Sequence, residues 1–211
     1  FVAPVTFPDK IQSLMQAVNL AEYAILNVTR LDKYLGEQLV ALDYSGLDGG
    51  FILHSYDIDE EKLRGMIKDT LISNFRFIES TDALKQEITS LEPKGKEGPL
   101  IIPIDHAFDV KGVGTVVLGV VKQGSVNIHD EVKIMPTGKT VLVKSIQMHD
   151  DPADKASSPS RVGLAIKGAS AEEISRGDII CDINSSLVAS SGHIPTKFEK
   201  SPFFKAELAE N

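Results

Sequence analysis

The chain has 211 residues, of which 42% are hydrophobic and 25% are charged, and its formal net charge is −8. This composition is typical of an ordinary globular protein, and the length predicts one large or two small domains. The only cysteine, Cys181, excludes an intrachain disulfide framework. No apolar run approaches the roughly 20 residues that span a bilayer. The acidic balance argues against a wide surface that grips a phosphate backbone, so we expect neither a membrane nor DNA as a partner.

The first part of the chain predicts strands that alternate with helices. The expected strands cover residues 1–5, 23–28, 50–54 and 75–78. Four helices are indicated by apolar residues at helical spacing: Ile11, Leu14, Met15 and Val18; Leu35, Leu39 and Leu42; Leu63, Met66, Ile67 and Thr70; Leu84, Ile88 and Leu91. The expected helix starts are Thr6 to Asp9, Asp57 or Asp59, and Ser80 or Thr81, and Gly46 is placed to end the second helix. This alternation predicts a parallel sheet covered by helices.

The composition changes after residue 91. Residues 92–98 combine proline, glycine and charges, as a solvated linker does. Beyond them, short β-rich segments separated by turns predict an antiparallel barrel, with strands at 100–104, 114–121, 131–135, 139–148, 161–168 and 178–183. Ser170 to Glu173 has the pattern of a capping box before a single helical turn. The expected organisation is an α/β domain at 1–91, a linker at 92–98, a barrel at 99–184 and a tail at 185–211 that begins a further domain.

Several short motifs suggest chemistry but have simpler interpretations. Gly138-Lys139-Thr140 has Lys133 where a phosphate loop needs a glycine, and it leads into a strand, which favours a hairpin turn. The glycines between 112 and 119 are expected to permit a bulge or the close approach of another backbone. Asp43 to Gly46 is expected to be a helix end. The five histidines lack the spacing of metal ligands, so the pattern alone gives no catalytic or metal site.

Residues Ile102 to Asp182 resemble the second domain of elongation factor Tu. The resemblance is carried by "DHAFDVKGVGTVVLGVVKQG" (105–124), "VKSIQMHD" (143–150) and "SRVGLAIKGASAEEISRGDII" (160–180). Within that family the chain is similar to an archaeal branch of elongation factor Tu domain-2 proteins, akin to the selenocysteine- and pyrrolysine-type factors. The resemblance implies an elongation-factor barrel preceded by part of a GTPase domain, and a cytoplasmic protein.

The same resemblance implies a degenerate nucleotide site in the first part. Residues 1–7 fall on the family's Asp-x-Pro-Gly-His segment, with Ala3 in place of the magnesium-linked Asp, Thr6 in place of Gly and Phe7 at the water-positioning residue. His54 to Asp57 fall on the guanine-reading Asn-Lys-x-Asp segment, of which only Asp57 is retained. The phosphate loop is expected before residue 1. We therefore expect no catalytic residue, no metal, and neither GTP nor magnesium as a cofactor, although the family uses both.

In the family, the barrel holds the 3′-terminal adenosine of aminoacyl-tRNA. By position, Val110 and Val116 are expected to form its apolar wall, Gly112 to allow close approach, and Gln147 to contact the terminal nucleotide. Since these positions also close the barrel, Val110 and Val116 are expected in its core. His149 and Arg161 fall where the esterified amino acid lies, and Ala165 replaces a larger wall residue. The expected partners are aminoacyl-tRNA and the ribosome; the alternatives are a GTPase with an upstream phosphate loop, or a ribosome-docking scaffold with a vestigial pocket.

Overall fold

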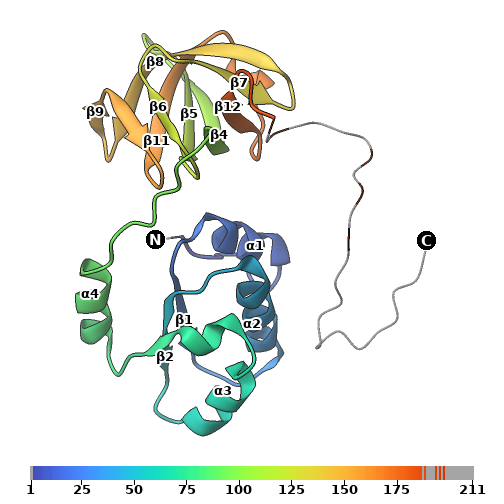
Figure 1. Ribbon diagram of the computed structural model, residues 1–211, viewed down its shortest axis with the longest axis vertical. Helices are drawn as coiled ribbons and strands as arrows, with labels where there is room; N and C mark the ends of the chain where they lie inside the picture. Colours follow the sequence, from blue (N-terminus) through green and yellow to red (C-terminus); the bar gives the residue numbers. More distant parts are fainter. Residues whose placement is uncertain (1, 187, 189–192, 194, 196, 198–211) are drawn as a thin grey trace.

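The computed structural model describes residues 2–186, 188, 193, 195 and 197. Within them, an α/β part and a β-barrel follow one another along the chain and are joined by an extended segment (Figure 1). None of the described helices is long and apolar enough to cross a membrane. The expected start of a further domain in the tail lies almost wholly outside the described residues. Both predicted fold types, a parallel α/β sheet and an elongation-factor-type barrel, are confirmed.

The α/β part contains a small parallel sheet. Its three strands lie in the order β1-β2-β3, with β1 paired to β2 and β2 to β3 in parallel. The elements are β1 (Ala24–Val28), β2 (Gly50–His54), β3 (Arg76–Phe77), α1 (Ile11–Leu20), α2 (Lys33–Ser45), α3 (Glu60–Ile67), the 3-10 turn η1 (Leu71–Asn74) and α4 (Thr81–Thr89). Parallel neighbours need crossover connections, and the helices supply them while covering the sheet.

The helix ends follow local sequence rules in three places. Asp59 and Ser80 accept hydrogen bonds from the first-turn amides of α3 and α4, and Gly46 ends α2 in the left-handed conformation with φ 75°. Asp32, which the sequence analysis did not single out, caps α2 by accepting from the amides of Tyr34 and Leu35. Such caps satisfy amides that the helix itself leaves without a partner.

The amino-terminal prediction was wrong. Val2 to Val5 form no strand, and α1 has Lys10 at its N-cap without any side-chain cap, so the expected Thr6 to Asp9 box does not start it. Local turns hydrogen-bond this segment instead, for example from the Lys10 amide to the Thr6 carbonyl at 2.9 Å. Thr70 and Leu91 also lie outside the helices to which their spacing assigned them.

The barrel closes from six antiparallel strands, and all six were predicted, although the first of them continues to Val110, well beyond its predicted end at residue 104. They are β4 (Ile101–Val110), β5 (Gly114–Val120), β7 (Glu131–Met135), β8 (Lys139–Met148), β11 (Arg161–Lys167) and β12 (Ile179–Asp182). The order β11-β5-β4-β12-β7-β8 returns to β11 through a β8–β11 ladder. Three further strands of three residues each were not predicted: β6 (Ser125–Asn127), β9 (Asp151–Ala153) and β10 (Lys155–Ser157).

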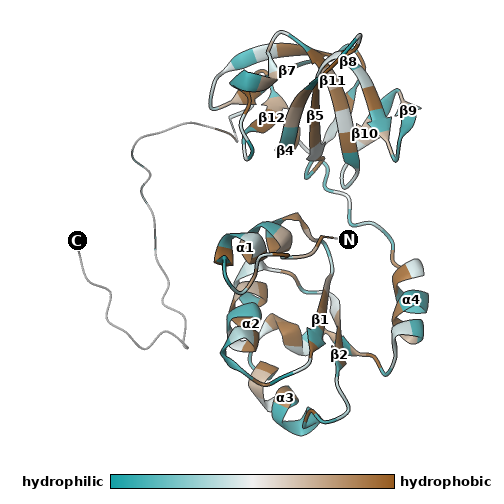
Figure 2. Cartoon of the chain, turned by 180° about the vertical axis from the view of Figure 1, so that it is seen from behind, coloured by the Kyte–Doolittle hydropathy of each residue, from teal (hydrophilic) through white to brown (hydrophobic). Residues whose placement is uncertain are grey.

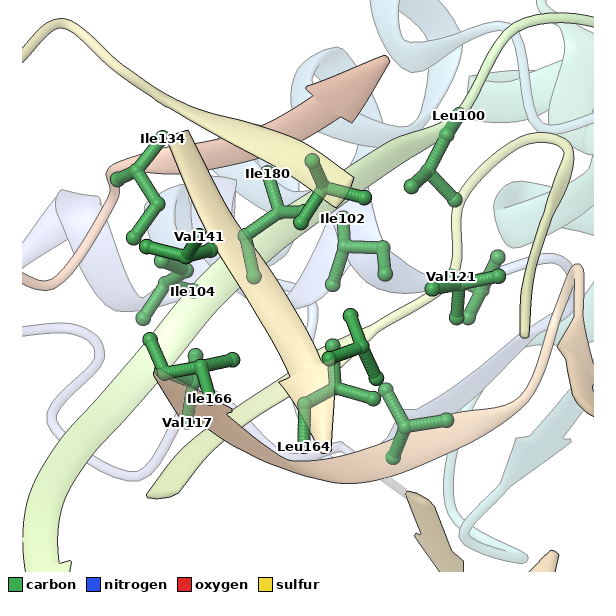
Figure 3. Packing of buried hydrophobic residues seen from close by; sticks show 14 of the residues in the cluster. Leu100, Ile102, Ile104, Val117, Val121, Ile134, Val141, Leu164, Ile166 and Ile180 are labelled. Atoms are coloured by element: carbon green, nitrogen blue, oxygen red, sulfur yellow. The ribbon is translucent and has the colours of Figure 1, made fainter. Parts of the chain in front are cut away.

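The barrel interior is filled by side chains that alternate along its strands. Ile102, Val117, Ile146, Leu164 and Ile180 are at most 1% exposed, and they belong to one cluster of apolar residues (Figure 3). Alternation is expected when one side of each strand faces the core. The buried face of the barrel is thus fixed by these residues, and their sequence neighbours point outward.

Two glycine motifs behave as their simpler interpretations predict. Gly138 has φ 73° in the turn between β7 and β8, so Gly138-Lys139-Thr140 is a hairpin and not a phosphate loop. A Cβ at Gly119 would lie 2.6 Å from the Pro103 carbonyl oxygen, which is the close backbone approach expected there.

The turn η2 (Ala171–Glu173) carries the predicted capping box, in which Glu173 also pairs with Lys139. These contacts hold the pKa of Glu173 at about 2, through the Lys139 hydrogen bond first and those of Ser170 next.

Candidate functional site

The residues assigned to the tRNA pocket come from four strands, β4, β5, β8 and β11, and from two turns. Val110 ends β4, Val116 lies on β5, and Gln147 lies on β8. Gly112 is in the turn between β4 and β5 with φ 82°, and His149 is in the turn between β8 and β9 with φ 53°. Their positions in the sheet decide whether one ligand could contact them together.

The strand register points Val110, Val116 and Gln147 to the outside of the barrel, with β4 and β8 separated by β5 and β11. Val116 pairs with Phe108 of β4 and with Ala165 of β11, while Gln147 pairs with Gly163 of β11. Directly paired residues in antiparallel strands share a face. Val117, Ile146 and Leu164 fill the core, so the alternate positions beside them point outward. We call the outward surface formed by Val110, Val116, Ala165, Gly163 and Gln147 the outer β-face.

The expectation that Val110 and Val116 are core residues was therefore wrong. Both are partly exposed, and the adjacent residue Val117 is the one in the core. β5 carries apolar residues on both sides, with Val116, Leu118 and Val120 outward, so its sequence alone does not tell which side is buried. The structure instead gives an apolar strip that a ligand can reach. Ala165 is only 4% exposed, although its strand position faces outward.

Arg161 and His149 lie at one end of the outer β-face. The β8–β11 ladder ends at Gly163 and Gln147; Arg161 lies two residues from Gly163 on β11, and His149 follows the last residue of β8 in the turn to β9. Arg161 also pairs with Val120 of β5, and both Arg161 and His149 are exposed. A flexible cation and an imidazole thus border the same surface as the apolar strip. Sequence reasoning did not single out Phe108, which is 42% exposed beside Val116.

Of the residues assigned to the degenerate nucleotide site, His54 and Asp57 lie at and after the end of β2, whereas Ala3, Thr6 and Phe7 precede α1. His54 ends β2, and its Nδ1 lies 3.0 Å from the Ser55 carbonyl oxygen while its Nε2 lies 3.3 Å from Glu60 Oε2. Arg64 donates to Glu60 Oε1 at 2.7 Å, which lowers the pKa of the Glu60 carboxyl. The Arg64 guanidinium also lies 3.8 Å from the centre of the Phe77 ring. His54 is thus engaged by the protein's own side chains.

The remaining members of that site differ in exposure and in their contacts. Ala3, Thr6 and Asp57 are exposed, and Phe7 packs edge-on against Tyr34 with the ring centres 6.3 Å apart. An alanine side chain has no oxygen to offer a magnesium ion. Among the residues that the structure describes, no group of three His, Cys, Asp or Glu side chains could hold a metal ion.

The chain thus combines a small parallel α/β sheet with a six-stranded antiparallel barrel. Residues 114–181 match the family described as elongation factor Tu domain 2. The chain therefore contains an elongation factor Tu domain 2 and is related to selenocysteine-specific elongation factors and elongation factor 1-alpha, as its sequence motifs indicated.

Two curated relatives cover both parts of the chain, and both come from Methanocaldococcus jannaschii. An uncharacterized protein, MJ0325, is 37% identical over 183 residues, which are 85% of this chain and 59% of that protein. The selenocysteine-specific elongation factor is 30% identical over 203 residues, which are 85% of this chain and 43% of the factor. This chain thus spans about half the length of these two relatives.

A solved structure agrees with the sequence relatives. Translation elongation factor SelB from Methanococcus maripaludis, in complex with the GTP analogue GPPNHP, superposes with a TM-score of 0.74 at 26% identity. The match covers 84% of this chain and 44% of that chain. The likeness extends over the α/β part as well as the barrel.

Proposed function

We propose that this chain is an elongation-factor-like module that binds the 3′ end of aminoacyl-tRNA through its outer β-face, without hydrolysing GTP itself. The observation that supports the proposal is the common outward orientation of Val110, Val116 and Gln147 within the run of paired strands β4-β5-β11-β8. The valines offer an apolar surface for a base, and the Gln147 amide can bond a ribose hydroxyl. The ribosome is the second expected partner, and the cytoplasm the expected location.

The RNA affinity expected of the outer β-face alone is modest. One base against an apolar or aromatic wall contributes about 1–3 kcal/mol. Since about 1.4 kcal/mol corresponds to a tenfold change in affinity, one docked nucleoside supports only weak binding. A titration followed by amide resonances suits this range, because it detects weak complexes and places them on the barrel.

The test is binding of a short RNA hairpin that ends in CCA, compared with the same hairpin without those nucleotides. We expect the CCA-ended RNA to shift the amide resonances of Val116 and Gln147. Val110→Asp and Gln147→Ala should each weaken binding roughly tenfold, because one places a charge on the wall and the other removes a polar contact. Gln86→Ala, an exposed change on α4, is the matched control and should leave binding unchanged. Equal affinity of wild type and both face variants would exclude this site.

The absence of GTP hydrolysis is proposed on the state of the degenerate nucleotide site. Phosphoryl transfer depends on magnesium and on positioned donors around the phosphates. Ala3 has no oxygen to coordinate a metal ion, and the His54 ring nitrogens contact the Ser55 carbonyl oxygen and Glu60 Oε2. We expect phosphate release from GTP at the rate of the protein-free buffer. Release clearly above that rate in wild type, and lost in Asp57→Ala, would instead support the GTPase alternative.

A further inference from the structure

A crevice of about 370 Å³ lies between the α/β part and the barrel. It is lined by the carboxyl ends of α1 and α2, by the linker, by the end of β5 and by the turn before β11. Its volume falls within the range of small-molecule sites. The crevice involves none of the residues assigned to the outer β-face or to the degenerate nucleotide site.

The linker holds both walls of this crevice. On the α/β side, Lys94 Nζ lies 3.0 Å from Asp48 Oδ1 and 4.6 Å from the centre of the Tyr23 ring. On the barrel side, the Lys96 amide donates to Ser158 Oγ at 3.1 Å, and the Gly124 amide donates to the Lys96 carbonyl at 2.8 Å. Residues from both parts are therefore tied to the same short segment.

The charged side chains that line the crevice differ in whether they form an ion pair. Three lysines, Lys94, Lys96 and Lys122, face two carboxylates, Glu22 and Asp48. Lys94 and Asp48 neutralise each other, whereas Lys96 and Lys122 make no ion pair with any residue that the structure describes. Burial lowers the pKa of Lys122, the charge of Lys96 lowers it further, and Glu22 opposes the change. Two ammonium groups that repel each other, one of them partly buried, are stabilised by an anion placed between them.

We propose that this crevice binds a phosphate group, contacted by Lys96 and Lys122. Ammonium groups are strong donors to phosphate oxygens, and bonds of this kind are stronger than neutral ones. The group could belong to a small phosphorylated molecule or to the backbone of an RNA strand. The assignment is independent of tRNA 3′-end binding, because different residues carry it.

The experiment titrates the whole chain with inorganic phosphate and, separately, with an oligouridine that has no CCA end. We expect amide shifts at Gly46, Lys122 and Ser158, which line the crevice. Lys122→Gln and Lys96→Gln should each weaken binding about tenfold, as removal of a charged hydrogen bond does. Lys155→Gln, an exposed change on β10, is the matched control.

The two ligands distinguish the sources of the phosphate. Saturation by inorganic phosphate alone supports a small phosphorylated ligand, whereas saturation by oligouridine at much lower concentration supports an RNA backbone. Shifts that map elsewhere, equal affinity of Lys122→Gln and Lys155→Gln, or no binding of either ligand would overturn the proposal.

Discussion

Replacement of Leu164 by alanine is expected to lower the free energy of unfolding of the barrel by about 2–5 kcal/mol. Leu164 is 0% exposed on β11 and belongs to the cluster that fills the barrel. The substitution removes apolar contacts and leaves a cavity. The strands of a closed barrel hold one another in place, so they cannot move inward to fill it. The measurement is a urea titration followed through barrel amide resonances, because two domains need not unfold as one unit.

Leu118→Ala is the matched control for this prediction. Leu118 lies on the neighbouring strand β5 and pairs with Gly163, but it points outward and is only partly buried. The same atoms are removed from a surface where water can enter, so less than half of the Leu164 effect is expected. Equal effects of the two substitutions would contradict the inward and outward assignment on which the outer β-face depends.

Replacement of Gly124 by alanine is expected to destabilise the barrel by about 2–5 kcal/mol. Gly124 has φ 71°, and a Cβ there would lie 2.5 Å from the Gly98 carbonyl oxygen and 3.0 Å from the Leu100 amide nitrogen. The cost combines a left-handed backbone with a collision against backbone atoms that cannot move aside. The same urea titration measures it.

Gly138→Ala separates these two contributions. Gly138 has φ 73°, almost the same as Gly124, but nothing lies within 4 Å of a Cβ built there. Only the backbone cost, about 1–2 kcal/mol, is therefore expected. If Gly124→Ala costs no more than Gly138→Ala, the linker does not pack against the barrel at Gly98 as described.

The outer β-face shows which features of the site can be predicted from short stretches of sequence and which cannot. The order of glycines, turns and strands from Ile102 to Asp182 was sufficient to predict the six barrel strands. The orientation of Val116 was not predictable, because Val116 and Val117 are equally apolar and alternation alone does not choose the buried side. Barrel closure makes that choice, since Val117 meets Leu164 and Ile146 inside.

Short-range rules likewise determined the helix ends at Gly46, Asp59 and Ser80, because a cap requires only residues a few positions apart. The same rules predicted a side-chain cap at the start of α1, but α1 begins without one. There the docking of Leu14 and Val18 into the α/β core stabilises the helix, a contribution that no local pattern contains.

By itself, the sequence determined the two fold types and the barrel strands, since each depends on residue type or on spacing within one segment. Only the tertiary structure showed that Val110, Val116 and Gln147 face outward and that His54, Glu60 and Arg64 contact one another. It also showed that Lys96 and Lys122 line the same crevice. Those arrangements depend on strand pairing and domain packing between residues far apart in the chain, where many pairings are compatible with the same local pattern.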